Sequence, residues 1–336
     1  MSAKNQLHTL DPLLTKALEH LIGTYKPSSM AKAIMAISDS YIHNEAPDNL
    51  WNDPQLTQAY LAYFMPLNTL RYQSALARLT EVGFLDSLTQ LIEFGSGAGA
   101  FYMALAGVSN TDFNQATFIE AGSEAKEVHK KLREQLLSQS KVEPLWSEQK
   151  NIKPTNLSLG VFSYSYNEIE RLPDWAIECE GLLIIEPSTH HHNRRLLELR
   201  ESLIKQGFYA WAPCTHQQTC PLLDHKKDWC HDRVNIELPE FMRKLENHLP
   251  MKNETITYSY LALRKTPPKN LSTNQARLIG DQLKEKGKTR QLICRSSERE
   301  FLSWLKRYGE APSSFRGDLY QLPEKVNKVS NEIRIS

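Results

Sequence analysis

A strand, a glycine-rich turn and a helix follow one another in the first third of the chain, and this succession constrains the fold most strongly. Leu91–Phe94 is a short apolar strand, and small apolar residues predict a helix over Ala98–Ala106. Between them, glycines stand at alternate positions: Gly95, Gly97 and Gly99. The first permits a tight turn, the second lets a ligand approach the backbone, and the third allows close strand–helix packing. An α/β fold with a ligand beside this turn is the first expectation.

Alternation of strands and helices continues after this turn. The hydrophobic pattern predicts the following strands and helices in chain order: a strand over Ala116–Ile119, a helix over Ser123–Gln139, strands over Leu157–Tyr166 and Gly181–Ile185, a helix over His190–Gln206, and strands over Phe208–Ala212 and Ile256–Leu263. Such alternation is typical of a parallel sheet with helices on both faces. Residues before position 89 have helical spacing, and Pro47, Pro54 and Pro66 divide them into separate helices.

Composition and charge exclude several classes of protein. The chain is 40% hydrophobic and 24% charged, and no apolar run reaches the roughly 18 residues of a membrane helix. Its first residues have neither secretory nor transit-peptide character, so we expect a cytoplasmic protein without a membrane partner. The net charge is +1, but residues 264–336 hold 16 Lys and Arg against 8 Asp and Glu. This basic end faces a polyanion or is a solvated helical tail.

Two acidic residues make the glycine turn more specific. Glu93 precedes the first glycine, and Glu120 ends the next strand, where a carboxylate can accept the ribose hydroxyls of a nucleoside cofactor. The spacing G-x-G-x-G disfavours a dinucleotide and looks like motif I of the S-adenosylmethionine-dependent methyltransferases. A purely structural glycine turn is the alternative.

This likeness implies a Rossmann-like, seven-stranded methyltransferase sheet whose last two strands form an antiparallel hairpin. Residues 89–265 would then form the methyltransferase domain, with a cysteine-rich, metal-binding insertion at 212–255 between the last two strands. Residues 1–88 would form an N-terminal helical region. Residues 266–336 would form a small basic C-terminal unit, in which one strand is predicted over Arg290–Cys294.

No catalytic residue is visible in the sequence. Amino-methyltransferases usually carry an Asn/Asp-Pro-Pro-aromatic run after the fourth strand, but residues 162–168 read Phe-Ser-Tyr-Ser-Tyr-Asn-Glu. Asn167 and Glu168 are candidate polar groups for an acceptor. The interpretation that we favour is structural, with Asn167 as the N-cap of the next helix.

Four of the five cysteines follow the predicted strand over Phe208–Ala212. Cys214, Cys220 and Cys230 form a C-x5-C-x9-C pattern, and His216 and His231 lie among them. Zinc sites usually contain a tight C-x2-4-C pair, whereas wide spacing suits an iron–sulfur cube with Cys294 as fourth ligand. Zinc held by the three clustered cysteines and one of the histidines remains the alternative.

A nucleophilic cysteine is a further alternative. The Pro-Cys pair that ends at Cys214 is similar to the nucleophile motif of RNA cytosine-C5 methyltransferases, although it follows the sixth strand here and not the fourth.

Several short motifs together resemble one family, the methyltransferase-like assembly factors of the mitochondrial small ribosomal subunit, which has bacterial relatives. The resemblance spans roughly residues 60–320. The motifs that carry it are Leu183–Thr189, Ala212–His216, Cys220–Leu222, Trp229–His231, Tyr258–Leu261, Ala276–Arg277 and Phe315–Asp318.

The resemblance implies a methyltransferase-like protein that acts on small-subunit rRNA during ribosome assembly, with the small subunit and its rRNA as partners and no role on DNA. It implies S-adenosylmethionine binding by Glu93, Gly95, Gly97, Gly99 and Glu120. It also implies a 4Fe-4S cluster on Cys214, Cys220, Cys230 and Cys294. Two alternatives stay open: a non-catalytic assembly factor that keeps the fold, and a small-molecule methyltransferase with a structural zinc.

Overall fold

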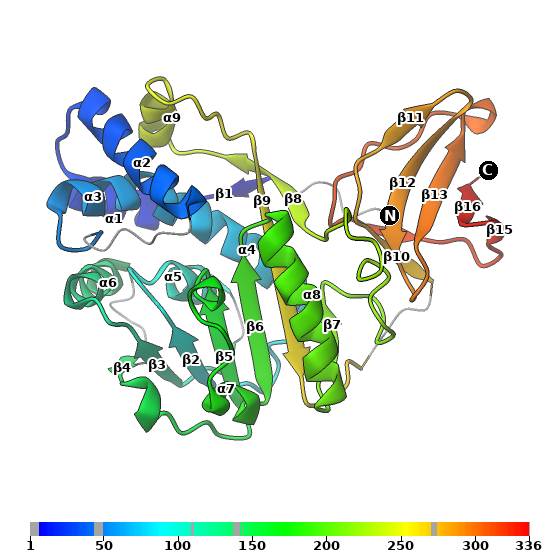
Figure 1. Ribbon diagram of the computed structural model, residues 1–336. Helices are drawn as coiled ribbons and strands as arrows, with labels where there is room; N and C mark the ends of the chain where they lie inside the picture. The colour runs from blue at the N-terminus through cyan, green and yellow to red at the C-terminus, as the bar shows by residue number, and fades with distance from the viewer. Residues whose placement is uncertain are drawn as a thin grey trace.

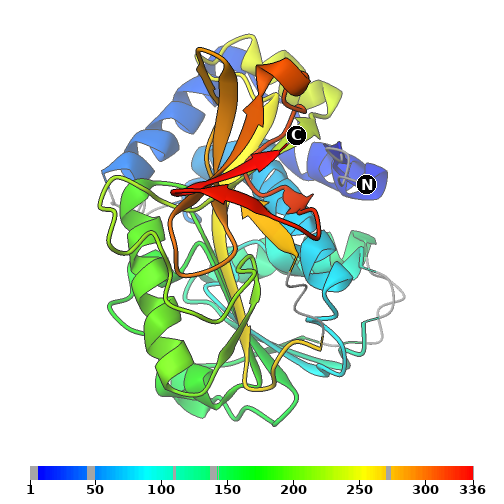
Figure 2. The same cartoon turned by 90° about the vertical axis from the view of Figure 1, so that its right-hand side faces the viewer.

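The computed structural model describes residues 7–43, 50–108, 111–136, 142, 144–269 and 274–335, which form two sheets with helices around the larger one (Figures 1 and 2). The larger sheet has nine strands and the smaller has seven. Strands of the smaller sheet all follow residue 274, and in Figure 1 they project from one side of the larger sheet.

Helices dominate the chain before the main sheet, as predicted. They are α1 (Pro12–Ile22), α2 (Pro27–Ile42), α3 (Pro54–Ala59) and α4 (Met65–Glu81), and a short strand, β1 (His8–Thr9), precedes them. Helices α1, α2 and α3 each begin with a proline, where the missing N–H breaks no helical hydrogen bond. Pro66 does not separate two helices as predicted, because a π-helical turn over Tyr60–Phe64 joins α3 to α4 without a gap. Asp11 and Asp53 cap α1 and α3 by accepting hydrogen bonds from backbone amides. Pro47 lies outside the described residues.

The main sheet contains the predicted methyltransferase order. Its strands are β2 (Gln90–Phe94), β3 (Gln115–Ile119), β4 (Pro144–Trp146), β5 (Ser158–Ser163), β6 (Gly181–Glu186), β7 (Tyr209–Ala212), β8 (Asp232–Glu237) and β9 (Thr255–Arg264). Seven of them follow the spatial order β4-β3-β2-β5-β6-β9-β7, with β9 antiparallel to both β6 and β7. This confirms the predicted fold class and the terminal hairpin. Strands β8 and β1 continue the sheet beside β9.

Helices cover both faces of this sheet. They are α5 (Ala100–Ala106), α6 (Ser123–Leu136), α7 (Asp174–Glu178), α8 (His190–Lys205) and α9 (Glu240–Glu246). Alternate residues of one strand serve opposite faces: Leu183 and Ile185 of β6 pack with the N-terminal helices, and Leu182 and Ile184 pack with α7 and α8. Burial on both faces explains why these strands are continuous apolar runs. The predicted end of α6 at Gln139 lies outside the described residues.

Half of the predicted insertion belongs to the main body. Strand β8 and helix α9 lie within residues 232–254, and β8 pairs with β9. The cysteine-bearing part, residues 213–231, contains neither helix nor strand. The sequence did not predict β8, because the charged Asp232 stands on its buried face and leaves only Val234 and Ile236 as an alternating apolar pair.

The C-terminal part of the chain is a sheet, and the helical-tail interpretation of its charge was wrong. Its strands are β10 (Gln275–Leu278), β11 (Leu283–Glu285), β12 (Lys288–Cys294), β13 (Glu300–Leu305), β14 (Leu319–Gln321), β15 (Asn327–Val329) and β16 (Glu332–Ile335). Only the segment within β12 was predicted as a strand. Several of the others are three residues long and half-exposed, so their apolar periodicity is too short to detect.

Candidate functional site

The glycine turn after β2 needs glycine for both conformation and space. Gly95 and Gly99 have φ of +65° and +82°. A Cβ atom at Gly95 would lie 2.7 Å from Cβ of Ser165, and one at Gly99 would lie 2.5 Å from the ring of His129 on α6. The first and third glycines therefore allow close packing of the turn against its neighbours, as the pattern predicted.

The second glycine is clamped by the acidic residue at the end of β3. Oε2 of Glu120 accepts a hydrogen bond from the Gly97 amide (2.7 Å), and Oε1 accepts one from the Gly122 amide (2.8 Å). Trp51, from the N-terminal region, lies over both glycines and packs edge-on against Tyr60, with ring centroids 4.9 Å apart. Tyr60 begins a π-helical turn (η1, Tyr60–Phe64), a distortion common at functional sites. The helical region thus covers the glycine turn.

Glu93 is fully buried beneath this turn. Ser163 at the end of β5 donates a hydrogen bond to its Oε1 (2.9 Å), and its Oε2 has no hydrogen-bond partner among the described residues. Burial raises the pKa of Glu93 to about 8. The carboxyl group is therefore largely protonated at neutral pH and presents one unused polar atom.

Four glutamates gather at the carboxyl ends of adjacent parallel strands. Glu186 ends β6 and accepts a hydrogen bond from the Tyr166 amide (3.1 Å), and burial raises its pKa to about 8. Burial and the charge of Glu120 raise the pKa of Glu168. Together with Glu93 and Glu120, they place four carboxyl groups at this edge, where ligands bind in open α/β sheets.

The segment after β5 is not a helix cap. Tyr166–Glu168 form a 3-10 turn, η3, and the next helix, α7, begins at Asp174 with Pro173 at its N-cap. The predicted N-cap role of Asn167 was therefore wrong, because η3 intervenes between the strand and the helix.

The buried Glu93 predicts a pH dependence of stability. Its pKa is about 8 in the folded chain and about 4.3 in an unfolded one. Between these values the folded chain holds one more proton, so the free energy of unfolding falls as pH rises, by up to about 1.4 kcal/mol per pH unit. Glu93→Gln removes this contribution. Urea unfolding at several pH values measures it, and the exposed Glu324→Gln is the control; equal slopes in Glu93→Gln and the wild type would contradict the assignment.

The four predicted metal-ligand cysteines converge from two parts of the chain. Cys214, Cys220 and Cys230 lie in the irregular segment 213–231, and Cys294 ends β12. The pKa of Cys294 is raised well above its usual value by burial and by the charges of the other three thiols. Thr215 also donates a hydrogen bond to the Cys294 carbonyl (3.0 Å). The C-terminal sheet therefore meets the insertion at these thiols, all of which are free.

Two buried arginines donate hydrogen bonds to these thiols. Nε of Arg200, on α8, lies 3.2 Å from Sγ of Cys214, and Nη1 of Arg277, on β10, lies 2.7 Å from Sγ of Cys230. Both arginine side chains are almost inaccessible to solvent. Each also pairs with one carboxylate, Glu201 for Arg200 and Asp232 for Arg277. Two guanidinium groups thus lie against sulfur atoms of the insertion.

Polar residues on α8 position the insertion, and the sequence analysis missed them. Asn193 accepts a hydrogen bond from the Cys230 amide (2.8 Å) and donates one to its carbonyl, while Glu201 accepts one from the Cys220 amide (3.1 Å). Asn193 and Arg200 are seven residues apart and share the buried face of an amphipathic helix. Polar residues among the apolar positions of that face were the available signal.

A histidine lies beside the thiols as well. Nε2 of His216 is 3.3 Å from Sγ of Cys294, whereas His231 stacks on Trp229. Burial lowers the pKa of each histidine to about 4, so both are neutral at neutral pH, the form that ligates metals. Within the described ranges, however, no group of three or more His, Cys, Asp or Glu side chains is arranged to hold a metal ion.

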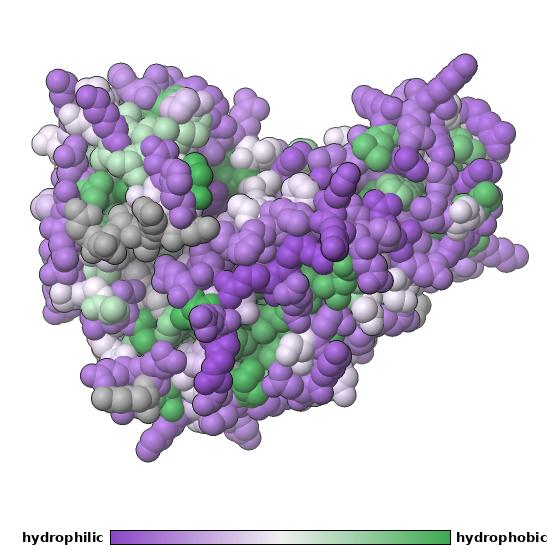
Figure 3. Space-filling view, viewed as in Figure 1, coloured by the Kyte–Doolittle hydropathy of each residue, from purple (hydrophilic) through white to green (hydrophobic). Residues whose placement is uncertain are grey.

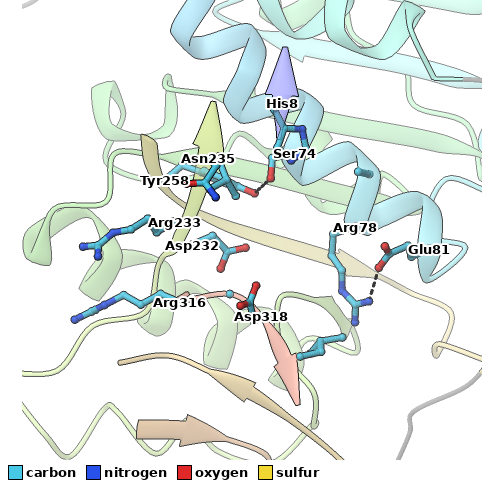
Figure 4. Close-up of a pocket in the computed structure, with 14 residues that line it drawn as sticks. His8, Ser74, Arg78, Glu81, Asp232, Arg233, Asn235, Tyr258, Arg316 and Asp318 are labelled. Atoms are coloured by element: carbon cyan, nitrogen blue, oxygen red, sulfur yellow. Dashed lines mark hydrogen bonds and ion pairs between the residues drawn. The ribbon is translucent and has the colours of Figure 1, made fainter. Parts of the chain in front are cut away.

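A cavity of about 140 Å³ lies where the two sheets meet (Figure 4). Residues from α4 and β8 and the segment 316–319 line it. Arg233 and Arg316 both pair with Asp281 (3.3 and 2.9 Å), and the Arg233 amide donates a hydrogen bond to the Arg316 carbonyl. Asp318 accepts a hydrogen bond from the Phe315 amide (2.8 Å). These contacts show that the Phe315–Asp318 motif docks the smaller sheet onto β8.

Sheet order and the glycine turn define a methyltransferase fold with a thiol-lined insertion. The chain matches the family described as mitochondrial small ribosomal subunit Rsm22 over residues 55–320. It therefore belongs to that family. No curated protein matches it. In the described ranges no helix is long and apolar enough to cross a membrane.

Solved structures similar to this chain include several methyltransferases. An rRNA methylase from Streptococcus thermophilus is 12% identical, covering 56% of this chain and 93% of its own, with a TM-score of 0.32. TrmK from M. capricolum, solved with S-adenosyl-homocysteine, is 12% identical, with coverages of 59% and 72% and a TM-score of 0.33. A human methyltransferase 10 domain containing protein is 14% identical, with coverages of 60% and 83% and a TM-score of 0.35.

Proposed function

We propose that this chain is a methyltransferase-like assembly factor that acts on the rRNA of the small ribosomal subunit, binds S-adenosylmethionine and holds a 4Fe-4S cluster. The convergence of four free cysteines from separate segments, with two buried guanidinium groups on their sulfur atoms, is the observation that carries the cluster. Family membership supports the ribosomal role. In this proposal residues 1–88 cover the methyl-donor site, residues 89–265 contain it together with the insertion at 212–255, and residues 266–336 supply Cys294.

The residues at the glycine turn fit S-adenosylmethionine, a ligand with a cationic sulfonium and a cationic amine. Glu93 offers a buried oxygen without a partner, and Glu120 and Glu168 add acidic character at the same strand edge. We assign the binding role to Glu93, Gly95, Gly97, Gly99 and Glu120. When bound, this cofactor supplies an activated methyl group.

The charges around the cysteines suit an anionic iron–sulfur cluster, although the described thiols are not grouped around one metal position. A cube ligated by four thiolates carries net negative charge, which a buried site must neutralise. Arg200 and Arg277 provide that charge through N–H···S contacts, and hydrogen bonds of this kind tune such clusters. We assign Cys214, Cys220 and Cys230 as ligands together with Cys294. Zinc is the alternative metal, and the contact of His216 with Cys294 favours it.

Non-catalytic assembly is the second candidate function, and the segment after β5 favours it. Tyr164 there is half-buried with φ +58°, Ser165 donates a hydrogen bond to the Phe94 carbonyl (2.7 Å), and the Glu186 carboxylate accepts one from the Tyr166 amide. This segment is thus tied into the fold, and it lacks the Asn/Asp-Pro-Pro-aromatic run with which amino-methyltransferases usually hold a methyl acceptor. Transfer of labelled methyl groups to small-subunit rRNA distinguishes the two candidates. The cytoplasmic location stays a prediction.

Substitution of the second glycine tests the methyl-donor site. Gly97→Asp places a carboxylate beside Glu120 and forces a non-glycine residue into φ +51°, so we expect S-adenosylmethionine binding to be lost. Isothermal titration calorimetry measures it, with circular dichroism to verify folding. Gly107→Asp, at the exposed C-cap of α5, is the matched control. A folded Gly97→Asp variant with wild-type affinity would refute the site.

Substitution of one cysteine tests the structural role of the cluster. Cys220→Ser should lower the melting temperature by several degrees and reduce solubility, and S-adenosylmethionine affinity should change little, because metal binding couples to folding of the insertion. Cys179→Ser, a buried cysteine packed against α7 and outside the cluster, is the control and should keep its metal. A larger effect on cofactor affinity than on stability would count against this role.

A further inference from the structure

The outer end of the C-terminal sheet carries a compact group of exposed basic and aromatic side chains. A two-residue turn, Lys286–Gly287, joins β11 to β12. The Gly287 carbonyl accepts a hydrogen bond from the Lys306 amide (3.0 Å). Lys306 begins the 3-10 turn η4 (Lys306–Tyr308) after β13. We call this end the basic tip and define it by Lys284, Lys286, Lys306, Arg307 and Tyr308. In Figure 1 it points away from the main sheet, and Figure 3 shows mainly hydrophilic side chains over this lobe.

Four cations of the basic tip lack ionic partners. Lys284, Lys286, Lys306 and Arg307 are exposed, and no carboxylate pairs with any of them within the described part of the chain. The nearby carboxylate of Glu285 pairs instead with Lys288 and Arg290 behind the tip. Uncompensated positive charge on a projecting surface attracts a polyanion.

An exposed aromatic ring accompanies this charge. The Tyr308 side chain is 57% exposed, and the guanidinium carbon of Arg307 lies 4.7 Å from its ring centroid. The Tyr308 ring has no packing role, since it belongs to none of the buried clusters in the described residues. Aromatic rings beside cations are what proteins use to stack unpaired RNA bases while contacting the adjoining phosphates.

We propose that the basic tip is an RNA-docking surface, on which the four cations contact phosphates and Tyr308 stacks on an unpaired base. This proposal rests on the proposed function, which supplies small-subunit rRNA as the target, and it names the surface that engages it. An unpaired stretch of RNA fits better than a membrane or an acidic protein, because the exposed ring offers a stacking face that neither of those partners requires.

Neutralising the four cations tests the phosphate contacts. The tip variant replaces Lys284, Lys286, Lys306 and Arg307 with Gln. A matched variant changes the net charge by the same amount elsewhere on the surface. It replaces four exposed lysines of α1, α2 and α6 with Gln: Lys16, Lys32, Lys130 and Lys131. Binding to a single-stranded RNA of about 20 nucleotides and to purified small ribosomal subunits is measured between about 50 and about 200 mM salt. On the single strand, we plot the logarithm of the binding constant against the logarithm of the salt concentration. We expect this slope to become shallower by about 3 in the tip variant and by less than about 1 in the matched variant.

Removing the ring tests the stacking contact separately. Tyr308→Ala should weaken RNA binding about 5- to 100-fold with little change in salt slope, since stacking carries no charge. Tyr209→Ala, which removes another exposed tyrosine on β7, should bind as the wild type does. Both substitutions are at exposed positions, so folding should be preserved, and melting temperature verifies it.

The outcomes separate this proposal from the proposed function. Small subunits that bind wild type and tip variant with equal salt slopes would overturn the tip and leave the ribosomal role standing. Equal losses in the two Gln variants, or tip-dependent binding to phosphatidylserine vesicles without RNA binding, would also overturn it. A wild-type chain that binds RNA through the tip but does not bind small subunits would overturn the proposed function alone.

Discussion

Buried polar side chains on α8 must all find partners, because an unpaired polar or charged group in a protein interior costs several kcal/mol. Segment 213–231, which has no helix or strand of its own, supplies those partners through the Cys214 sulfur and the Cys220 and Cys230 backbone. One helix face therefore holds three cysteines in place. Without that face, the insertion would have few contacts to define its shape.

The same sheet carries both candidate sites. Strand β9 pairs with β6, β7 and β8, so the glutamates at the ends of the parallel strands and the thiols beside α8 belong to one rigid framework. Main-body strand β8 begins at Asp232, which pairs with Arg277 of the second sheet. Arg277 in turn contacts the Cys230 sulfur. The two sheets thus meet at these thiols, and for this reason Cys294 of the second sheet lies beside the cysteines of the insertion.

Strands buried on both faces and amphipathic helices could be predicted from the sequence, and short half-exposed strands could not. Strands β2 and β6 are apolar except for Gln90 and the two glutamates, and α8 has a clear apolar stripe. Strand β4, at the sheet edge, has only three residues, and most strands of the C-terminal sheet are short and carry charged residues, so no local pattern reveals them. Tertiary pairing and not propensity places these strands.

For the candidate sites, motifs in the sequence predicted the glycines, Glu93, Glu120, Cys214, Cys220 and Cys230 as site residues, whereas Cys294 was predicted from its position in an Arg-rich strand. Their binding roles stay predictions. The sequence did not predict the roles of Arg200, Asn193 and Arg277, because these roles depend on contacts between segments distant in sequence. The position of Trp51 over the glycine turn was not predicted for the same reason.

Iron, acid-labile sulfide and zinc content, with an absorption spectrum of the full chain purified without oxygen, test the central claim most directly. The account predicts about four irons and about four sulfides per chain with broad visible absorption. Stoichiometric zinc without visible absorption, or a chain that holds no metal, would contradict it.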